Sequence, residues 1–467
     1  MNNFAFMRDI EMDNVVSLKE NVEQLHKSME DDNHFGDVMV VGGGISGIQA
    51  SLDLATAGFK VYLVERNPSI GGRMAQLDKT FPTMDCSMCI LAPKMIECSH
   101  HSNVQLLSYS EIKEVKGSIG NFKVKVLRKP RYVDEKKCTG CGICSENCPT
   151  EALNEFDENI GARKAIYMPF PQAVPRVAVI DKKNCVECGL CEKVCPAGAV
   201  NREQQPEEVK LDVGAIVVAT GFDLFDASVI PQYGFGRFKN VISAMELERL
   251  LCASGPTGGH LIRPSEGKKP RHMAFIQCVG SRDRREWIDH PYCSSICCKY
   301  AVKDAVLIKE HEPNSLVSIF YIDMRAFGRG FQEFVNRAKS EFGIEFIRSS
   351  PGEISEDPKT NDLSISFENP ITRTVQNIRF DMVVLCPALI PSRGMPELAK
   401  TLGIELDNYG FVKLEDSVRK PLDTTVPGIF CCGYCLGPKT GDIPDSITQG
   451  SATAARVAEV LAVKEAQ

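Results

Sequence analysis

Two runs of four cysteines carry the clearest chemistry in this chain of 467 residues. Each run has the pattern C-x-x-C-x-x-C-x-x-x-C-P, and the residues are Cys138, Cys141, Cys144 and Cys148, then Cys185, Cys188, Cys191 and Cys195. Three thiolates on one short loop can bind three corners of an iron–sulfur cubane, while the fourth cysteine of each run reaches the other cluster. We therefore expect Cys195 to complete the first [4Fe-4S] cluster and Cys148 the second. A structural zinc site, the alternative, leaves the third cysteine and the proline unexplained.

The remaining cysteines fall into looser groups. A C-x-x-x-C-C pattern and one earlier cysteine precede an apolar-periodic helix and suggest a third [4Fe-4S] cluster, held by Cys278, Cys293, Cys297 and Cys298. Buried free thiols in a core helix are the alternative. A further group could form a metal site completed from elsewhere or by a partner subunit, redox-active thiols, or structural thiols: Cys86, Cys89 and Cys98. The other five should pack as small hydrophobic residues: Cys252, Cys386, Cys431, Cys432 and Cys435.

A glycine-rich segment, VVGGGISGIQA at 40–50, predicts a site for a dinucleotide phosphate. It lies between an apolar strand at 37–41 and a helix at 45–57, and a second strand follows at 61–64. The glycines let the backbone approach the pyrophosphate, and the helix N-terminus supplies partial positive charge. Glu65 ends the second strand where an acidic residue binds a ribose hydroxyl. The phosphate-loop residues are Gly42, Gly44, Ile45, Ser46 and Gly47. A glycine-rich turn in an ordinary βαβ unit is the alternative.

Three stretches resemble the FAD-contacting segments of flavoproteins with two dinucleotide-binding domains: ERNPSIGGRM at 65–74, GAIVVATGF at 214–222 and VPGIFCCGYCLGP at 426–438. The resemblance implies that FAD contacts Glu65, Arg66, Gly72, Arg73, Met74, Ala219, Thr220, Gly221, Gly433 and Ile443. Tyr434 stands where such proteins carry an aspartate that binds the ribityl chain. In their second domain a strand leads into another glycine loop, but after the strand at 273–276 only Gly280 remains, and Cys278 occupies the loop. We predict that this domain does not bind NAD(P)H in the usual way.

These motifs predict an α/β fold. It is a thioredoxin-reductase-like flavoprotein with two dinucleotide domains, a Rossmann-like FAD domain among them, and an inserted α+β double [4Fe-4S] ferredoxin domain. The expected segments are an N-terminal extension at 1–36, FAD-binding parts at 37–130, 208–267 and 391–467, the ferredoxin insertion at 131–207, and a degenerate NAD(P)H-like domain at 268–390. An insertion at this point holds the clusters beside the flavin domain, so electron transfer is the expected purpose.

Composition narrows the class of protein. The net charge of −7 provides no field for nucleic acid or an anionic membrane surface. The first residues show no signal-peptide pattern, and no segment reaches the ~18 apolar residues of a spanning helix. We expect a cytoplasmic protein whose cysteines are not disulfides, with membrane association only through partners. The eight histidines lack hydrolytic-metal spacing. An amphipathic pattern near the N-terminus, for docking on a partner or on its own domain, has Val15, Leu18, Val22, Leu25 and Met29.

From about residue 36 the chain resembles the A subunit of heterodisulfide reductases and its relatives. The resemblance rests on GGRMAQLDKTFPTMDCSMCILAPKM, the inserted ferredoxin pair, CVGSRD with YCSSICCKYA, and GPKTGDIPDSITQGSATAARVA. It implies FAD in a core that has lost nicotinamide binding, with clusters carrying electrons to and from it. Lys439 matches a family lysine near the reactive edge of the flavin, where a cation stabilises the anionic reduced ring; a solvated loop lysine is the alternative. Long family members carry further cysteine-containing domains at both ends.

The resemblance implies an electron-transferring flavoprotein subunit that bifurcates or relays electrons in a complex. Expected partners are B- and C-type subunits, hydrogenase- or dehydrogenase-linked subunits and ferredoxin, with a homodimer within the complex. Relatives also occur in quinone-interacting oxidoreductases and class II benzoyl-CoA reductases. The competing hypothesis from another class is a self-contained NAD(P)H-dependent disulfide or ferredoxin reductase, which requires the nicotinamide site that the loop at Cys278 lacks. A structural platform with vestigial clusters is a third, and the intact ferredoxin motifs weigh against it.

Overall fold

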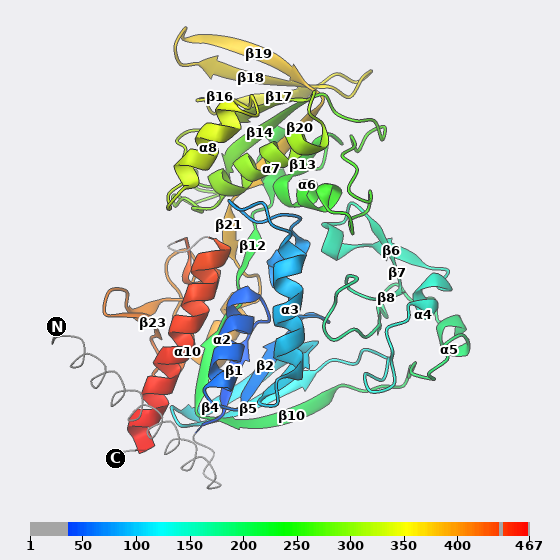
Figure 1. The fold of residues 1–467 in the computed structure, drawn as a ribbon, viewed down its shortest axis with the longest axis vertical. Helices are drawn as coiled ribbons and strands as arrows, with labels where there is room; N and C mark the ends of the chain where they lie inside the picture. Colours follow the sequence, from blue (N-terminus) through cyan, green and yellow to red (C-terminus); the bar gives the residue numbers. More distant parts are fainter. Residues whose placement is uncertain (1–35, 439–441, 466–467) are drawn as a thin grey trace, which may run out of the picture.

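A seven-stranded sheet is the centre of the domain that contains the glycine-rich segment (Figure 1). The computed structural model describes residues 36–438 and 442–465. The sheet has the order β22-β23-β24-β11-β1-β2-β3, with parallel pairing from β24 through to β3. Its strands are β1 (Val38–Val41), β2 (Val61–Glu65), β3 (Val104–Ser108), β11 (Ala215–Val218), β22 (Leu414–Asp416), β23 (Lys420–Thr424) and β24 (Ile429–Cys431). Strands β1 and β11 are buried at every position, as expected where both faces of a parallel sheet are covered.

Helices cover one face of this sheet, and a small second sheet covers the other. The first layer contains α2 (Ile45–Thr56), η1 (Gly72–Gln76), α3 (Ser87–His100) and α10 (Ile443–Glu465). The second contains β4 (Ser110–Ser118), β5 (Asn121–Arg128), β10 (Glu207–Val213), α9 (Met395–Leu402) and η5 (Gly433–Leu436). Helices α2 and α10 approach closely, since a Cβ on Gly450 would lie 2.6 Å from the Ser46 carbonyl oxygen. This approach keeps the start of α10 beside the phosphate loop.

The segment with the two cysteine runs lies between β5 and β10. These two strands pair antiparallel along their length, with Arg128 opposite Glu207, so the chain leaves and re-enters the flavin domain at neighbouring positions. The inserted elements are α4 (Ile143–Glu146), β6 (Glu151–Leu153), η2 (Glu155–Asp157), β7 (Ala162–Lys164), β8 (Ile166–Tyr167), β9 (Val179–Ile180) and α5 (Leu190–Lys193). Figure 1 shows this part beside α3, at the right of the view.

A second α/β unit lies above the flavin domain in Figure 1. Its parallel sheet has the order β13-β20-β14-β15-β16, and an antiparallel pair, β12 with β21, joins it to the flavin domain. The strands are β12 (Phe222–Leu224), β13 (Val241–Ser243), β14 (His272–Val279), β15 (Leu316–Phe320), β16 (Glu345–Ile347), β20 (Met382–Pro387) and β21 (Leu389–Pro391). The helices are η3 (Ala227–Val229), η4 (Pro231–Tyr233), α6 (Ala244–Leu251), α7 (Cys297–His311) and α8 (Phe331–Ser340).

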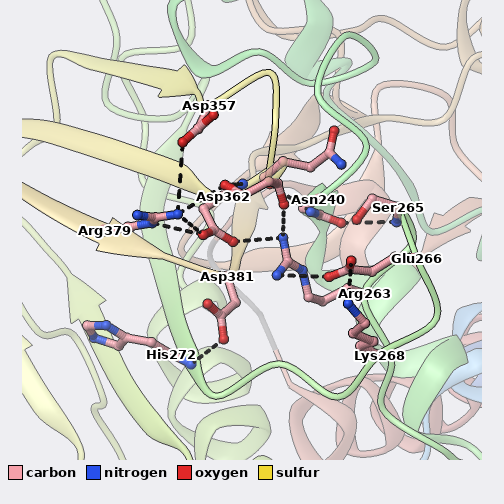
Figure 2. Close-up of polar contacts among 12 residues, drawn as sticks. Asn240, Arg263, Ser265, Glu266, Lys268, His272, Asp357, Asp362, Arg379 and Asp381 are labelled. Atoms are coloured by element: carbon pink, nitrogen blue, oxygen red, sulfur yellow. Dashed lines mark hydrogen bonds and ion pairs between the residues drawn. The ribbon is translucent and has the colours of Figure 1, made fainter.

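A three-stranded antiparallel sheet caps this second unit: β17 (Glu353–Glu356), β18 (Leu363–Asn369) and β19 (Thr374–Phe380). Figure 2 shows the polar contacts that fasten it. Asp362 pairs with Arg263 at 2.9 Å and also with Arg379. The buried Asn240 side chain donates to the carbonyl of Asn361 at 2.8 Å. These contacts attach the start of β18 to the segment before β14, far from the phosphate loop.

The three parts of the chain meet at a buried arginine. Arg249 of α6 pairs with Asp157 of the insertion at 2.9 Å and donates to the carbonyl of Gln76 in the flavin domain at 3.0 Å. Its guanidinium lies 4.8 Å from the Phe156 ring centre, and Phe156 stacks on Phe170 at 4.7 Å. The inserted segment is therefore held against both other parts.

Among the described residues, no helix combines the length and apolar character needed to cross a bilayer. The amphipathic pattern expected between Val15 and Met29 lies outside the described residues.

We expect Arg249→Ala to lower the free energy of unfolding by about 3–5 kcal/mol, because it leaves the Asp157 carboxylate buried without its partner. Urea denaturation measures this change, and limited proteolysis should show faster cleavage of the loop at 154–161. The control is Arg337→Ala, which removes an exposed pair with Glu341 on α8 and should cost about 0.3–0.5 kcal/mol. Equal unfolding midpoints for the two variants would contradict the role given to Arg249.

Candidate functional site

A cavity of about 830 Å³ opens at the carboxyl ends of β1 and β2, where the three parts of the chain meet. Phe156 and Phe170 of the insertion line it, as do Lys299 and Lys303 of α7. The predicted cofactor residues on its wall are Gly42, Gly44, Ile45, Ser46, Glu65, Arg66, Gly72, Arg73, Met74, Ala219, Thr220, Gly221 and Ile443. Gly47 and Gly433 lie behind the wall, and Lys439 is outside the described residues. A ligand in this cavity would touch both the phosphate loop and the inserted domain.

The glycines of the phosphate loop have different roles. Gly42 has a φ of +110°, and a Cβ there would lie 2.4 Å from the Ala219 carbonyl oxygen. A Cβ on Gly47 would lie 1.9 Å from the Gly42 carbonyl oxygen, so these two glycines let α2 pack against the strand ends. Gly44 is the N-cap of α2, with a φ of −78°, and no atom lies within 4 Å of the point that its Cβ would occupy. The space at Gly44 faces the cavity, where the helix N-terminus favours a phosphate.

Glu65 lies at the end of β2 with its carboxylate turned to the loop. One oxygen accepts the N–H of Gly43 at 2.7 Å, and the other accepts the N–H of Asn67 at 2.8 Å. Burial raises the pKa of Glu65, and these two hydrogen bonds oppose that rise. Each oxygen keeps a second lone pair for a ribose hydroxyl. The geometry suits the ribose contact predicted from the sequence.

Arg73 joins the cavity wall to two distant carboxylates. It pairs with Glu158 of the insertion at 2.7 Å and with Asp223 of β12 at 3.0 Å. Arg66 also approaches Asp223, at 3.9 Å. The guanidinium of Arg73 therefore positions the inserted domain as well as facing the cavity.

Sequence reasoning missed a group of charged residues on the opposite wall. Lys303 of α7 contacts the carboxylate of Glu248 and lies 2.9 Å from that of Asp304. Lys299, one turn earlier, pairs with Asp442 at 2.8 Å. Burial alone would lower the pKa of Lys303, but the two adjacent carboxyls reverse this effect and the pKa is raised. The available signal was the presence of charges inside the apolar pattern of α7.

The ferredoxin cysteines gather in the two sets that their spacing predicts. One small cavity is lined by Cys138, Cys141, Cys144 and Cys195. A second is lined by Cys148, Cys185, Cys188 and Cys191. Burial raises the pKa of Cys144 to about 11 and also raises that of Cys191. In the part of the chain that the structure describes, no three His, Cys, Asp or Glu side chains converge on a single ion. Both sets suit a cubane better than a zinc ion.

The four cysteines of the irregular pattern also lie together, between β14 and the first turn of α7. The thiol of Cys278 interacts electrostatically with those of Cys293 and Cys298, and Cys297 lies among all three. Cys278 has a φ of +61°, which is rare for a residue with a side chain. Burial raises the pKa of Cys278 to about 11.

Cys86 and Cys89 are joined as a disulfide at the start of α3, so the expectation that the chain has no disulfide is wrong for this pair. The N–H of Cys89 donates to the Cys86 sulfur at 3.2 Å. Cys98 lies two turns further along α3, where burial raises its pKa to about 12. The structure therefore separates Cys98 from the other two.

Four of the five cysteines expected to act as small hydrophobic residues are buried in the apolar clusters: Cys386, Cys431, Cys432 and Cys435. Cys252 is half-buried at the end of α6. The expectation is wrong for Cys252, which lies at the surface beside Ser254.

The fold and the cavity define a flavoprotein of the class with two dinucleotide domains. Solved structures with the same fold include thioredoxin reductase from Lactococcus lactis, at 16% identity and a TM-score of 0.51, covering 91% of this chain and 99% of that one. Thioredoxin reductase from Thermoplasma acidophilum gives 13% identity and the same TM-score, over 90% and 98% of the two chains. Residues 37–85 match the model of an FAD dependent oxidoreductase, and residues 137–199 match that of a 4Fe-4S dicluster domain.

Relatives identify the family. The second iron-sulfur A subunit of the CoB--CoM heterodisulfide reductase of Methanopyrus kandleri is 54% identical over 91% of this chain and 64% of its own length. The A subunit of the H(2):CoB-CoM heterodisulfide,ferredoxin reductase of Methanothermobacter marburgensis is 51% identical, over 90% and 63%. Over this shared portion the chain belongs to the A-subunit family of heterodisulfide reductases. It spans just under two thirds of the length of these relatives.

We expect Gly44→Ala to weaken FAD binding at least about tenfold, or ~1.4 kcal/mol, because its Cβ enters the space for the phosphate. The backbone tolerates alanine at φ −78°, and the lost glycine N-cap costs no more than about 1 kcal/mol of stability. Flavin absorbance per protein and the unfolding midpoint measure the two effects. Gly352→Ala, with one atom at 3.7 Å and no cavity contact, is the control. Full FAD content in Gly44→Ala would refute the phosphate position.

Proposed function

We propose that this chain is the FAD- and [4Fe-4S]-containing electron-transfer subunit of a heterodisulfide-reductase-type complex. The observation that carries the proposal is a single cavity bordered by a dinucleotide phosphate loop, by the ferredoxin insertion and by the cysteine-bearing helix α7. Bound there, FAD would exchange electron pairs with donors or acceptors and single electrons with clusters. An equivalent subunit of a benzoyl-CoA reductase or quinone-interacting complex uses the same parts.

The residues of the chain divide the work of holding the cofactor. Glu65 would accept a ribose hydroxyl, and the N-terminus of α2 would take the pyrophosphate. The predicted contacts Ile443 and Thr220 lie on the same cavity wall, and the Thr220 hydroxyl has no hydrogen-bond partner among the described residues. Phe156 and Phe170 exclude water on the side of the insertion. This unpartnered hydroxyl is what a bound flavin would satisfy.

A third [4Fe-4S] cluster at Cys278, Cys293, Cys297 and Cys298 belongs to this proposal. Its support is the gathering of four thiols from two elements at the start of α7. The N-terminus of a helix favours thiolates, and Arg282 lies beside Cys278. A cluster there would lie on the other side of the cavity from the ferredoxin pair, so electrons could enter and leave by separate routes.

The nicotinamide alternative has no support from the second domain. Gly280, the last glycine of the expected loop, is packed on Phe225, since a Cβ there would lie 2.3 Å from that ring. An aromatic ring therefore fills the place where a pyrophosphate would approach the backbone.

Partners are part of the proposal. The names of the relatives couple this type of subunit to H(2), to ferredoxin or, in Methanosarcina acetivorans, to F(420)H(2). Cys141 and Cys188 are exposed, so each ferredoxin cluster would have an edge open to another protein of the complex. Separate cluster routes on two sides of one flavin are also what bifurcation requires. Anaerobic purification of the complex, and identification of the proteins that accompany this chain, tests the assignment.

We expect about twelve irons per FAD in the intact protein and about eight in Cys293→Ser, since one [4Fe-4S] cluster is lost. Iron and flavin analysis of anaerobically purified protein measures the ratio. Cys252→Ser, which changes a cysteine outside every group, should keep the wild-type ratio. A wild-type ratio of about eight would remove the third cluster from the proposal and leave the ferredoxin pair.

We expect NADH and NADPH to leave the flavin absorbance of the purified protein unchanged, because Phe225 blocks the nucleotide loop. Dithionite should bleach the same sample, which shows that the flavin is reducible. Anaerobic visible spectroscopy makes both measurements. Bleaching by either nucleotide would favour the self-contained reductase.

A further inference from the structure

Three ionisable side chains are buried together on the cavity wall: Glu248 of α6, and Lys303 and Asp304 of α7. The Lys303 ammonium contacts Glu248, lies 2.9 Å from Asp304, and donates to the carbonyl of Lys79 at 3.1 Å. None of the three side chains is more than 3% exposed. One ammonium group therefore faces two carboxyl groups away from water.

The charges of this group do not balance if both carboxyls are ionised. A net negative charge would then remain in a buried site, which is strongly unfavourable. Glu248 is the better placed carboxylate, because it accepts the N–H of Asp78 at 2.9 Å in addition to the Lys303 contact. Neither oxygen of Asp304 accepts an oriented hydrogen bond from a described residue. Donors favour the ionised form, so the proton resides on Asp304.

The other groups that face Asp304 do not change this assignment. They are Tyr300 on the same helix and Cys386 of β20, and burial raises the pKa of both, so they stay neutral. Among the described residues, Lys303 is the only cation that acts on Asp304. Burial and then Glu248 raise the pKa of Asp304 well above its usual range. The hydroxyl of Tyr300 also lacks a partner and lines the cavity.

We infer that Asp304 is held as a neutral carboxylic acid beside the flavin site and gives its proton to the cavity when the bound cofactor is reduced. The inference rests on the proposed function, in which clusters supply the electrons. Two electrons enter from the clusters, which are oxidised, and the cofactor is reduced. The O–H bond of Asp304 breaks, and its proton forms an N–H bond on the cofactor ring. The remaining carboxylate pairs with Lys303 and regains a proton from solvent.

Redox-difference infrared spectroscopy of the anaerobically purified holoprotein tests this inference. In the wild type, reduction should change a carboxylic-acid C=O band, and that band should shift in D2O. Asp304→Asn should lose the band while FAD and iron contents stay at wild-type values. Its flavin should be reduced by viologen radical about 10²-fold more slowly, and faster as the pH falls, because solvent must supply the proton.

Glu246→Gln is the matched control. Glu246 is a largely buried carboxyl of α6 with a pKa raised by burial, but it caps the helix through Ser243 and does not line the cavity. This variant should keep the redox-linked band and the reduction rate. If the wild type shows no carboxylic-acid band although its FAD is reduced, the inference about Asp304 is overturned and the proposed function stands. If FAD does not bind, or the clusters do not reduce it, the proposed function itself fails.

Discussion

The antiparallel pairing of β5 with β10 is the constraint on which the arrangement of the molecule depends. Electron transfer weakens steeply with distance, so a cluster domain on a flexible tail could not serve one flavin reliably. Here the chain leaves and re-enters the flavin domain through paired strands, and the insertion is then fixed by Arg249 on Asp157 and by Arg73 on Glu158. The geometry of the cofactor cavity and that of the cluster loops are therefore set by the same contacts.

The second domain shows how a nucleotide-binding unit can serve another purpose without losing its fold. Its parallel sheet is intact, but β14 ends in Cys278 rather than a glycine loop, and Phe225 packs against Gly280. Helix α7 then carries two kinds of chemistry on successive turns. Its first turn presents cysteines to the proposed cluster, and its middle presents Lys303 and Asp304 to the cavity.

Features formed by consecutive residues could be predicted from the sequence. The turn at Gly42 predicted a strand and a helix at 45–57, and the structure has them as β1 and Ile45–Thr56. Cysteine spacing predicted which sulfurs share a cavity, because each loop supplies three of four. Contacts between distant residues could not be predicted: Lys303 and Glu248 are 55 residues apart, and Arg249 and Asp157 are 92 apart. Neither pair has a local pattern, since packing of whole elements brings them together.

The cysteines show why composition alone could not assign their roles. Burial strongly raises the pKa of Cys386 and Cys432, so these thiols remain protonated and behave as small apolar side chains. Burial acts on Cys297 in the same direction, although its position beside Cys278 suits a ligand. A buried thiol becomes a thiolate only where a nearby cation compensates its charge, and cluster iron supplies that charge. The open ferredoxin loops need less compensation, because water reaches Cys141 and Cys188. Binding of the third cluster should therefore be more strongly coupled to the folding of its domain than binding of the other two.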